Sequence, residues 1–154
     1  MAWQPYVSEM MKNDRVCQAW IGGHNGATWA QSAGFSLGAR TVNVTQEDGS
    51  TAPTNVNEPA LLLEATTGYV SSGSGLWLNG QKFMCVNYMA NVETGGGVTY
   101  LKTKTGGACL VKTKQCILLG IWSAKNSAGA PWQNPASCNG DVEELAAKLG
   151  TAGY

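Results

Sequence analysis

Apolar residues near the start of the chain recur at the spacing of an amphipathic helix. Pro5 lies in the first turn of this pattern, where its missing N–H is not needed. The pattern predicts a helix that ends at Asn13-Asp14. Its apolar residues follow the i, i+3, i+4, i+7, i+8 rule for one helical stripe, and they are Trp3, Tyr6, Val7, Met10 and Met11.

Segments typical of β-strands come after this helix. Residues 16–23 and 27–31 flank Asn25-Gly26, a dipeptide that strongly favours a tight hairpin turn. Residues 75–122 predict a meander of strands separated by Asn-Gly and glycine-rich turns. Its strands are expected at 76–78, 82–89, 98–104, 108–112 and 115–122, with turns at 79–80, 94–97, 105–107 and 113–114.

Two more helices are predicted downstream. One spans 58–66, with Pro59 at its start, where proline is tolerated. The other spans 141–149, where Asp141 and Glu144 resemble a capping box before an apolar stripe. Both segments end beside a glycine, which favours helix termination.

Two long stretches have the composition of loops. Residues 32–55 and 123–137 are rich in Gly, Ser, Thr and Asn or in Asn, Ala and Pro, and both are expected to be mostly loop. The element order is therefore helix, two strands, helix, strand meander, helix. This order predicts an α+β fold with one antiparallel sheet and helices packed on its faces. A length of 154 residues suits a single domain over 1–154.

Composition narrows the classes of partner. The 10 Lys+Arg balance the 10 Asp+Glu, so the chain offers no broad electrostatic field for nucleic acid or membrane. No apolar run approaches the roughly 20 residues of a spanning helix, and the first residues do not form a signal peptide. The five cysteines are expected to be reduced, mostly buried thiols of a cytosolic protein.

Motifs of catalytic and metal sites are incomplete. Residues 34–38 match the G-x-S-x-G nucleophile elbow around Ser36, but that elbow needs a later histidine and the one histidine, His24, precedes it. Lys104-Thr105-Gly106 lacks the S-x-x-K that accompanies K-T-G, and no C-x-x-C occurs. We therefore expect no enzyme, no metal and no cofactor. A small hydrolase that uses Ser36 or a cysteine is the alternative.

Aromatic residues lie near both ends of the chain. Trp3 and Tyr6 are one turn apart on the first predicted helix, and Tyr154 is the last residue. If the first and last helices lie side by side, these three rings line one groove. The alternative is that Trp3 and Tyr6 are ordinary core residues of an amphipathic helix.

Several segments, in order along the chain, resemble those of profilins. The resemblance implies an antiparallel sheet with the N- and C-terminal helices packed on one face and a further helix on the other. It also implies a cytoplasmic, cytoskeleton-associated protein that binds its partners without covalent chemistry. The segments are Trp3-Gln4-x-Tyr6-Val7, Trp29-Ala30-Gln31-Ser32, Gly75-Leu76-x-Leu78-x-Gly80-x-Lys82-Phe83, Leu101-Lys102-Thr103-Lys104-Thr105-Gly106-Gly107 and the final helix, from Asn139 to Tyr154.

This resemblance implies a poly-L-proline site between the terminal helices, for proline-rich partners such as formins. The chemistry suits a polyproline II helix, whose prolines stack on aromatic rings and whose carbonyls accept hydrogen bonds from Trp and Tyr. Lys148 departs from the family, whose members commonly carry a histidine or an aromatic residue there. The matched positions are Trp3, Tyr6, Trp29, Lys148, Leu149 and Tyr154.

The resemblance also implies a second surface, for monomeric actin. Lys102 and Lys104 alternate onto the same face of a predicted strand, although a solvated strand face would show the same pattern. With actin on one face and a proline-rich partner on the other, the protein would deliver actin to filament ends. The matched positions are Lys102, Lys104, Asn139 and Glu144, with Lys112 and Lys114 as further candidates.

Departures from the family pattern motivate an alternative function. Residues 66–74 contain no basic residue, where many profilins carry several, and Gly140 and Asp141 replace lysines of some members. A phosphoinositide patch would be small, since each basic residue near an anionic surface contributes about 1 kcal/mol. Residues 46–55 and 124–137 exceed the family pattern in length. The alternative is a proline-motif adaptor with weak or lost actin binding.

Overall fold

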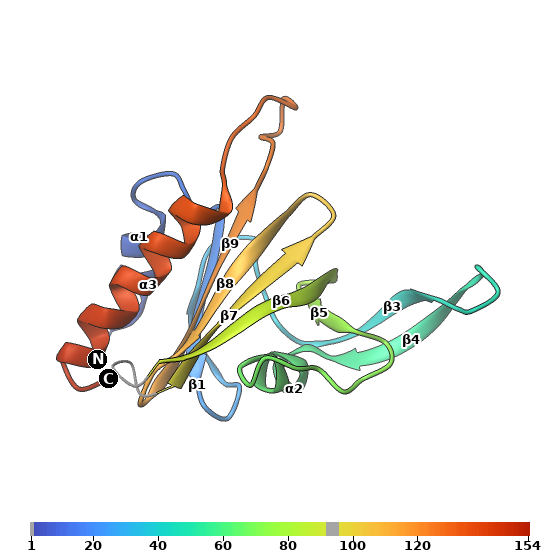
Figure 1. The fold of residues 1–154 in the computed structure, drawn as a ribbon, viewed down its shortest axis with the longest axis horizontal. Coiled ribbons are helices and arrows are strands. Elements are labelled where there is room, and N and C mark those ends of the chain that lie inside the picture. Colours follow the sequence, from blue (N-terminus) through green and yellow to red (C-terminus); the bar gives the residue numbers. More distant parts are fainter. Residues whose placement is uncertain (1, 92–95) are drawn as a thin grey trace.

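A seven-stranded antiparallel sheet forms the centre of the computed structural model, which describes residues 2–91 and 96–154 (Figure 1). The strands lie in the order β2-β1-β9-β8-β7-β6-β5, so the chain's first hairpin joins the end of the later meander at β9. The turn predicted at 94–97 lies largely outside the described residues. The strands are β1 (Gln18–Gly23), β2 (Thr28–Gln31), β5 (Leu76–Leu78), β6 (Gln81–Asn91), β7 (Gly96–Thr103), β8 (Gly106–Lys112) and β9 (Cys116–Ser123).

Helices cover both faces of this sheet, as Figure 1 shows. Helices α1 (Gln4–Met11) and α3 (Pro135–Thr151) pack together on one face, and α2 (Glu58–Ala65) packs on the other. Strand β9 alternates between the two cores: Leu118 packs with α1 and α3, whereas Leu119 packs with α2. The predicted α+β fold, with both terminal helices on one face, is confirmed.

The expectation that residues 32–55 are mostly loop is wrong. This region forms most of a second, two-stranded sheet, in which β3 (Ala39–Thr45) pairs antiparallel with β4 (Thr51–Asn57) and extends away from the main sheet (Figure 1). Val42 and Val44 are buried, while Asn43 between them and Thr41 and Thr45 on either side are exposed. This is the alternation of a half-buried strand, and threonine favours strands, so the sequence did contain the signal.

The last helix begins six residues earlier than predicted. Helix α3 starts at Pro135, because the side chain of Asn134 accepts a hydrogen bond from Ser137 N at 2.9 Å and caps it. An asparagine N-cap followed by proline is a strong start signal. Asp141 therefore lies inside the helix rather than at its N-terminus, and the predicted loop 123–137 shortens at its end.

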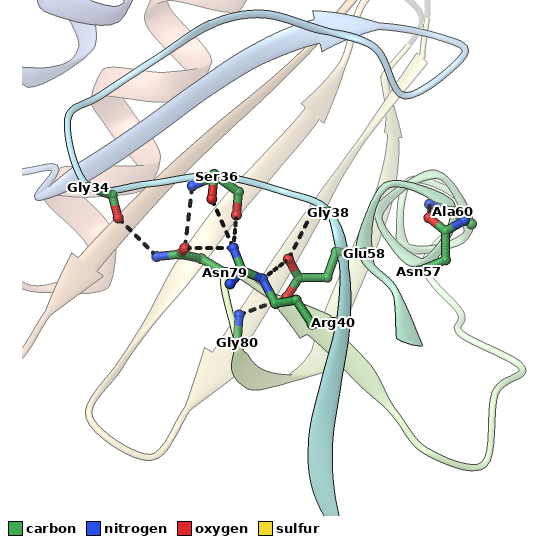
Figure 2. A network of polar contacts seen from close by, with 9 residues as sticks. All are labelled: Gly34, Ser36, Gly38, Arg40, Asn57, Glu58, Ala60, Asn79 and Gly80. Atoms are coloured by element: carbon green, nitrogen blue, oxygen red, sulfur yellow. Dashed lines mark hydrogen bonds and ion pairs between the residues drawn. The ribbon is translucent and has the colours of Figure 1, made fainter. Parts of the chain in front are cut away.

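A buried carboxylate joins the β3–β4 hairpin to the rest of the molecule (Figure 2). The Glu58 side chain, at the start of α2, is fully buried. Its Oε1 accepts from Arg40 Nε at 2.7 Å and from Gly38 N at 3.2 Å, and its Oε2 accepts from Gly80 N at 2.7 Å. One carboxylate thus fixes β3, α2 and the β5–β6 turn relative to one another.

The G-x-S-x-G segment belongs to the same network. Arg40 Nη2 donates to Ser36 Oγ at 2.8 Å, and the Asn79 side chain accepts from Ser36 N at 3.3 Å (Figure 2). His24 lies elsewhere, with its Nε2 bonded to the Thr113 carbonyl at 2.9 Å. Ser36 therefore faces an arginine and not an imidazole, which is a structural arrangement and not that of an activated nucleophile.

Replacing Glu58 tests how much this network contributes. Glu58→Gln leaves Arg40 without its carboxylate, and we expect the free energy of unfolding to fall by about 2 kcal/mol. The measurement is urea unfolding followed by tryptophan fluorescence. The control is Glu64→Gln on the same helix, where the carboxylate is partly exposed and a change within about 0.5 kcal/mol is expected. Equal effects of the two substitutions would contradict the role of Glu58.

Candidate functional site

Four aromatic rings from distant parts of the sequence meet at one end of the molecule. The Trp3 ring centroid lies 5.5 Å from that of Tyr6, 4.9 Å from that of Trp29 and 5.4 Å from that of Tyr154. These separations fall in the range of interacting aromatic pairs. We call Trp3, Tyr6, Trp29 and Tyr154 the aromatic cluster.

The elements around the cluster hold it in place. Trp3 caps α1, Trp29 lies in β2, and Tyr154 follows α3, so the two ends of the chain lie side by side (Figure 1). The carbonyl of Tyr154 accepts from Gln115 N at 2.6 Å and from Thr113 Oγ1 at 2.7 Å. The β8–β9 turn therefore fixes the last residue beneath the first helix.

The rings of the cluster are only partly covered. Trp29 is 40% exposed, and the other three residues have intermediate exposure. The alternative that Trp3 and Tyr6 are fully enclosed core residues does not hold. The cluster is instead an aromatic surface with solvent access.

The remaining two positions matched to the poly-L-proline site, Leu149 and Lys148, are not members of the aromatic cluster. Leu149 is only 1% exposed and belongs to the core under the cluster, so its side chain supports the rings without reaching the surface. Lys148 is exposed and lies 3.3 Å from Glu9 Oε1 on α1. Lys148 thus borders the groove between the terminal helices rather than joining the aromatic cluster.

The lysines matched to actin binding fall at two ends of the sheet. Lys102 is exposed on β7, and Lys104 is exposed in the turn before β8. Lys112 ends β8, and Lys114 lies in the next turn, beside the residue that binds Tyr154. Seven strand residues span roughly 20 Å, so the two pairs do not form one patch.

The two matched residues on α3 point in different directions. Glu144 lines the groove that faces α1, whereas Asn139 lies on the other side of α3, one turn before Glu143. Glu143 faces the sheet, where its Oε1 accepts from Tyr100 OH at 3.2 Å. The helical period of 3.6 explains this difference, since neighbouring residues point about 100° apart.

The sequence patterns did not predict that four apolar residues of β6 are exposed. We call Met84, Val86, Tyr88 and Met89 the β6 edge; they are 64%, 61%, 39% and 47% exposed. Strand β5 pairs only with the start of β6, and a register shift between Cys85 and Asn87 lifts Val86 out of the ladder with β7. The spacing of Met84, Val86 and Tyr88 was a signal of a partly exposed strand.

A groove lies beside the β6 edge, near the first lysine pair. It has a volume of about 720 Å³, and its lining includes Met84, Lys102 and Lys104. Met84 is paired directly with Lys102 across the two strands. The exposed side chain of Met84 therefore lies next to two cations on this part of the surface.

The comparisons with known proteins agree on one family. A family model described as Profilin matches residues 1–154. The profilin of Tetrahymena pyriformis is 34% identical over 157 residues, which cover 99% of this chain and 98% of that protein. The chain belongs to the profilin family. Profilins are non-enzymatic, actin-binding proteins.

Solved profilins share this architecture over their whole length. Profilin II of Acanthamoeba castellanii is 28% identical, with a TM-score of 0.69 and 99% of each chain covered. Mouse profilin IIa, solved in complex with a double repeat from the FH1 domain of mDia1, is 17% identical, with a TM-score of 0.62 and 100% of each chain covered. The profilin fold of the present chain is therefore established.

The thiols of this profilin have the environment of structural cysteines. All five are free, and Cys109, Cys116 and Cys138 are buried. Burial raises the pKa of Cys138 to about 12 and raises the pKa of Cys17, which is partly exposed. Protonated thiols are poor nucleophiles.

Within residues 2–91 and 96–154, no group of three or more His, Cys, Asp or Glu side chains is arranged to hold a metal ion. Over the same residues, none of the helices is both long and apolar enough to cross a membrane.

Tyr100 provides a titration test of this profilin's sheet surface. Burial, the negative charge of Glu143 and the hydrogen bond to it raise the pKa of Tyr100 from 10.0 to about 12. Between these values the unfolded chain loses the phenol proton first, so the free energy of unfolding falls as pH rises through that range. We expect Tyr100→Phe to remove this part of the alkaline destabilisation, measured by urea unfolding at increasing pH. An identical alkaline loss in the variant would contradict the assignment.

Proposed function

We propose that this profilin binds proline-rich segments through the aromatic cluster and monomeric actin through the surface beside the β6 edge. With both partners bound, it would deliver actin to growing filament ends, since a tethered monomer has a raised effective concentration there. This role fits a cytoplasmic, cytoskeleton-associated protein. The observation that carries the proposal is the convergence of three partly exposed rings, from α1, β2 and the residue after α3, on Trp3 in a chain of the profilin family.

Unused hydrogen-bond donors support a polyproline ligand. The indole N–H groups of Trp20, Trp77 and Trp132 donate to protein oxygens at 2.8 Å. Among the described residues, those of Trp3 and Trp29 have no such acceptor. A polyproline II helix has carbonyl acceptors and no N–H donors, and its proline rings stack on aromatic faces. The aromatic cluster therefore offers the N–H donors that a polyproline II helix lacks.

The FH1 complex of mouse profilin IIa supports the same class of partner. That protein shares the fold of this chain and was solved with a double repeat from the FH1 domain of mDia1. We extend this to proline-rich segments of formins as partners of the present chain.

The actin surface is supported by its position and its chemistry. The β6 edge is an exposed apolar strip, and such strips on a folded protein commonly mark protein–protein contacts. Lys102 and Lys104 border it, and cations beside an apolar patch favour an acidic partner surface. The Lys112–Lys114 end of β8 lies by Tyr154 instead, so we leave it out of the actin surface.

One observation favours the alternative, a proline-motif adaptor with weak or lost actin binding. Residues 66–74 carry no positive charge, and Tyr69 in this segment is 72% exposed. Electrostatic attraction from this side of the molecule is therefore weak. Actin binding by the wild-type protein decides between the two functions.

Removing the central ring tests the proline site. We expect Trp3→Ala to weaken binding of a ten-proline peptide by more than about tenfold, because Trp3 contacts all three other rings and such central aromatic residues dominate binding energy. Binding is measured by calorimetry, with folding checked by circular dichroism. The control is Trp132→Ala in the loop before α3, where the ring is 39% exposed and its N–H donates to Asp14, which follows the end of α1 opposite to Trp3. Unchanged binding in Trp3→Ala would contradict the site.

Reversing one charge tests the actin surface. We expect Lys102→Glu to weaken binding of monomeric actin by about tenfold and to leave polyproline binding unchanged, because the lysine borders the β6 edge and not the rings. The control is Lys114→Glu at the other end of β8. Sequestration of actin monomers and release of labelled nucleotide from actin are the measurements. Equal losses in both variants would contradict the surface, and no actin binding by wild type would favour the adaptor.

A further inference from the structure

A polar pocket lies between α1 and α3. The two helices run antiparallel, since Trp3 meets Tyr154 at one end and Arg15 lies 3.7 Å from Asp141 at the other. Between them is a pocket of about 240 Å³. Its polar lining consists of Glu9, Lys12, Asn13, Asp141, Glu144 and Lys148.

Both lysines of the pocket are occupied by a single carboxylate. Glu9 Oε1 lies 2.8 Å from Lys12 Nζ and 3.3 Å from Lys148 Nζ. The hydrogen bonds from these two lysines lower the pKa of Glu9. Glu9 therefore pairs with both ammonium groups of the pocket, so each lysine already has a carboxylate partner.

The acids of α3 lack corresponding donors. The Asp141 side chain is 8% exposed, and its one ion pair is the long contact of Oδ1 with Arg15. Its Oδ2 is buried and has no hydrogen-bond partner in the described part of the chain. Among the same residues, Glu144 has no ion pair within 4 Å. A buried carboxylate oxygen without a donor is costly, which points to a cation that binds here.

The pocket lies within reach of a ligand held by the rings. Tyr6 and Glu9 are one turn apart on the same side of α1, and Asn13 lies one further turn along. From Tyr6 to Asn13 is about 10 Å along a helix. A polyproline II chain advances about 3.1 Å per residue, so about three residues lead from the ring of Tyr6 to the pocket.

We propose that this pocket receives a lysine or arginine side chain that flanks the proline run of the bound segment. The inference rests on the proposed proline-rich ligand and narrows it to runs with a basic residue about three positions beyond the prolines on the rings. The exposed carboxylate of Glu144 accepts the cation, the carboxylate of Asp141 adds negative charge beside it, and Lys12 and Lys148 remain with Glu9. An acidic residue at the same position meets the negative charges of Glu144 and Asp141 and is disfavoured.

The test compares a peptide of ten prolines with extended peptides that all have one length. Each extended peptide adds two alanines and then arginine, glutamate or alanine after the ten prolines, or the same residues before them. Both placements are needed because a polyproline helix can bind in either direction. We expect the arginine peptide of one direction to bind about three- to tenfold more tightly than its alanine counterpart, with the gain reduced by salt.

Protein variants locate the gain. Glu144→Gln is expected to abolish it and to leave the ten-proline peptide unaffected, whereas Glu143→Gln, the same change on the side of α3 that faces the sheet, retains it. Equal affinity for the arginine and alanine peptides, a preference for glutamate, or a gain that survives Glu144→Gln would each overturn the inference while the proline site stands. If no peptide binds the wild-type protein, the proposed function and this inference fail together.

Discussion

Contact between the two ends of the chain shapes the proposed binding surface. The Trp3 ring touches rings from α1, from β2 and from the residue after α3, and each such pair contributes about 0.5–1.5 kcal/mol beyond the area that it buries. Hydrogen bonds from the backbone of Gln115 and the hydroxyl of Thr113, in the β8–β9 turn, hold Tyr154 in place. The rings are therefore ordered before a ligand arrives, which lowers the entropy cost of binding.

Different helices cover the two faces of the sheet, and this makes the arrangement of the proposed binding surfaces possible. On one face, α1 and α3, which are far apart in the sequence, cover the core. The aromatic cluster forms where the start of α1 meets the residue after α3. The α2 face is anchored by the buried carboxylate of Glu58, which also carries the β3–β4 arm. The β6 edge is left between these two faces with little cover. Two partners can thus meet the same rigid sheet without competing for one surface.

Sequence patterns predicted the elements whose signals are local. The stripe of α1 and the Asn-Gly turns needed no tertiary information. The arm of β3 and β4 was missed because threonine and asparagine outnumber its buried valines, so composition outweighed alternation. Four of the six residues matched to the proline site meet in the structure. The matching could not tell that Leu149 is core or that only Glu144, of the matched pair Asn139 and Glu144, lines the groove that faces α1, since burial depends on what packs against α3.

Lys148 illustrates how one departure from the family pattern changes a groove. Its ion pair with Glu9 joins two side chains that are 58% and 36% exposed, and such a pair contributes only about 0–1 kcal/mol. A weak pair of this kind rearranges at little cost. The same lysine draws Glu9 toward itself and Lys12, and among the described residues this leaves Glu144 without an ion pair and Asp141 with only its long contact to Arg15. In the proposed site, the aromatic cluster would bind prolines with little dependence on salt, and charge in the neighbouring polar pocket would select among ligands that share the same prolines.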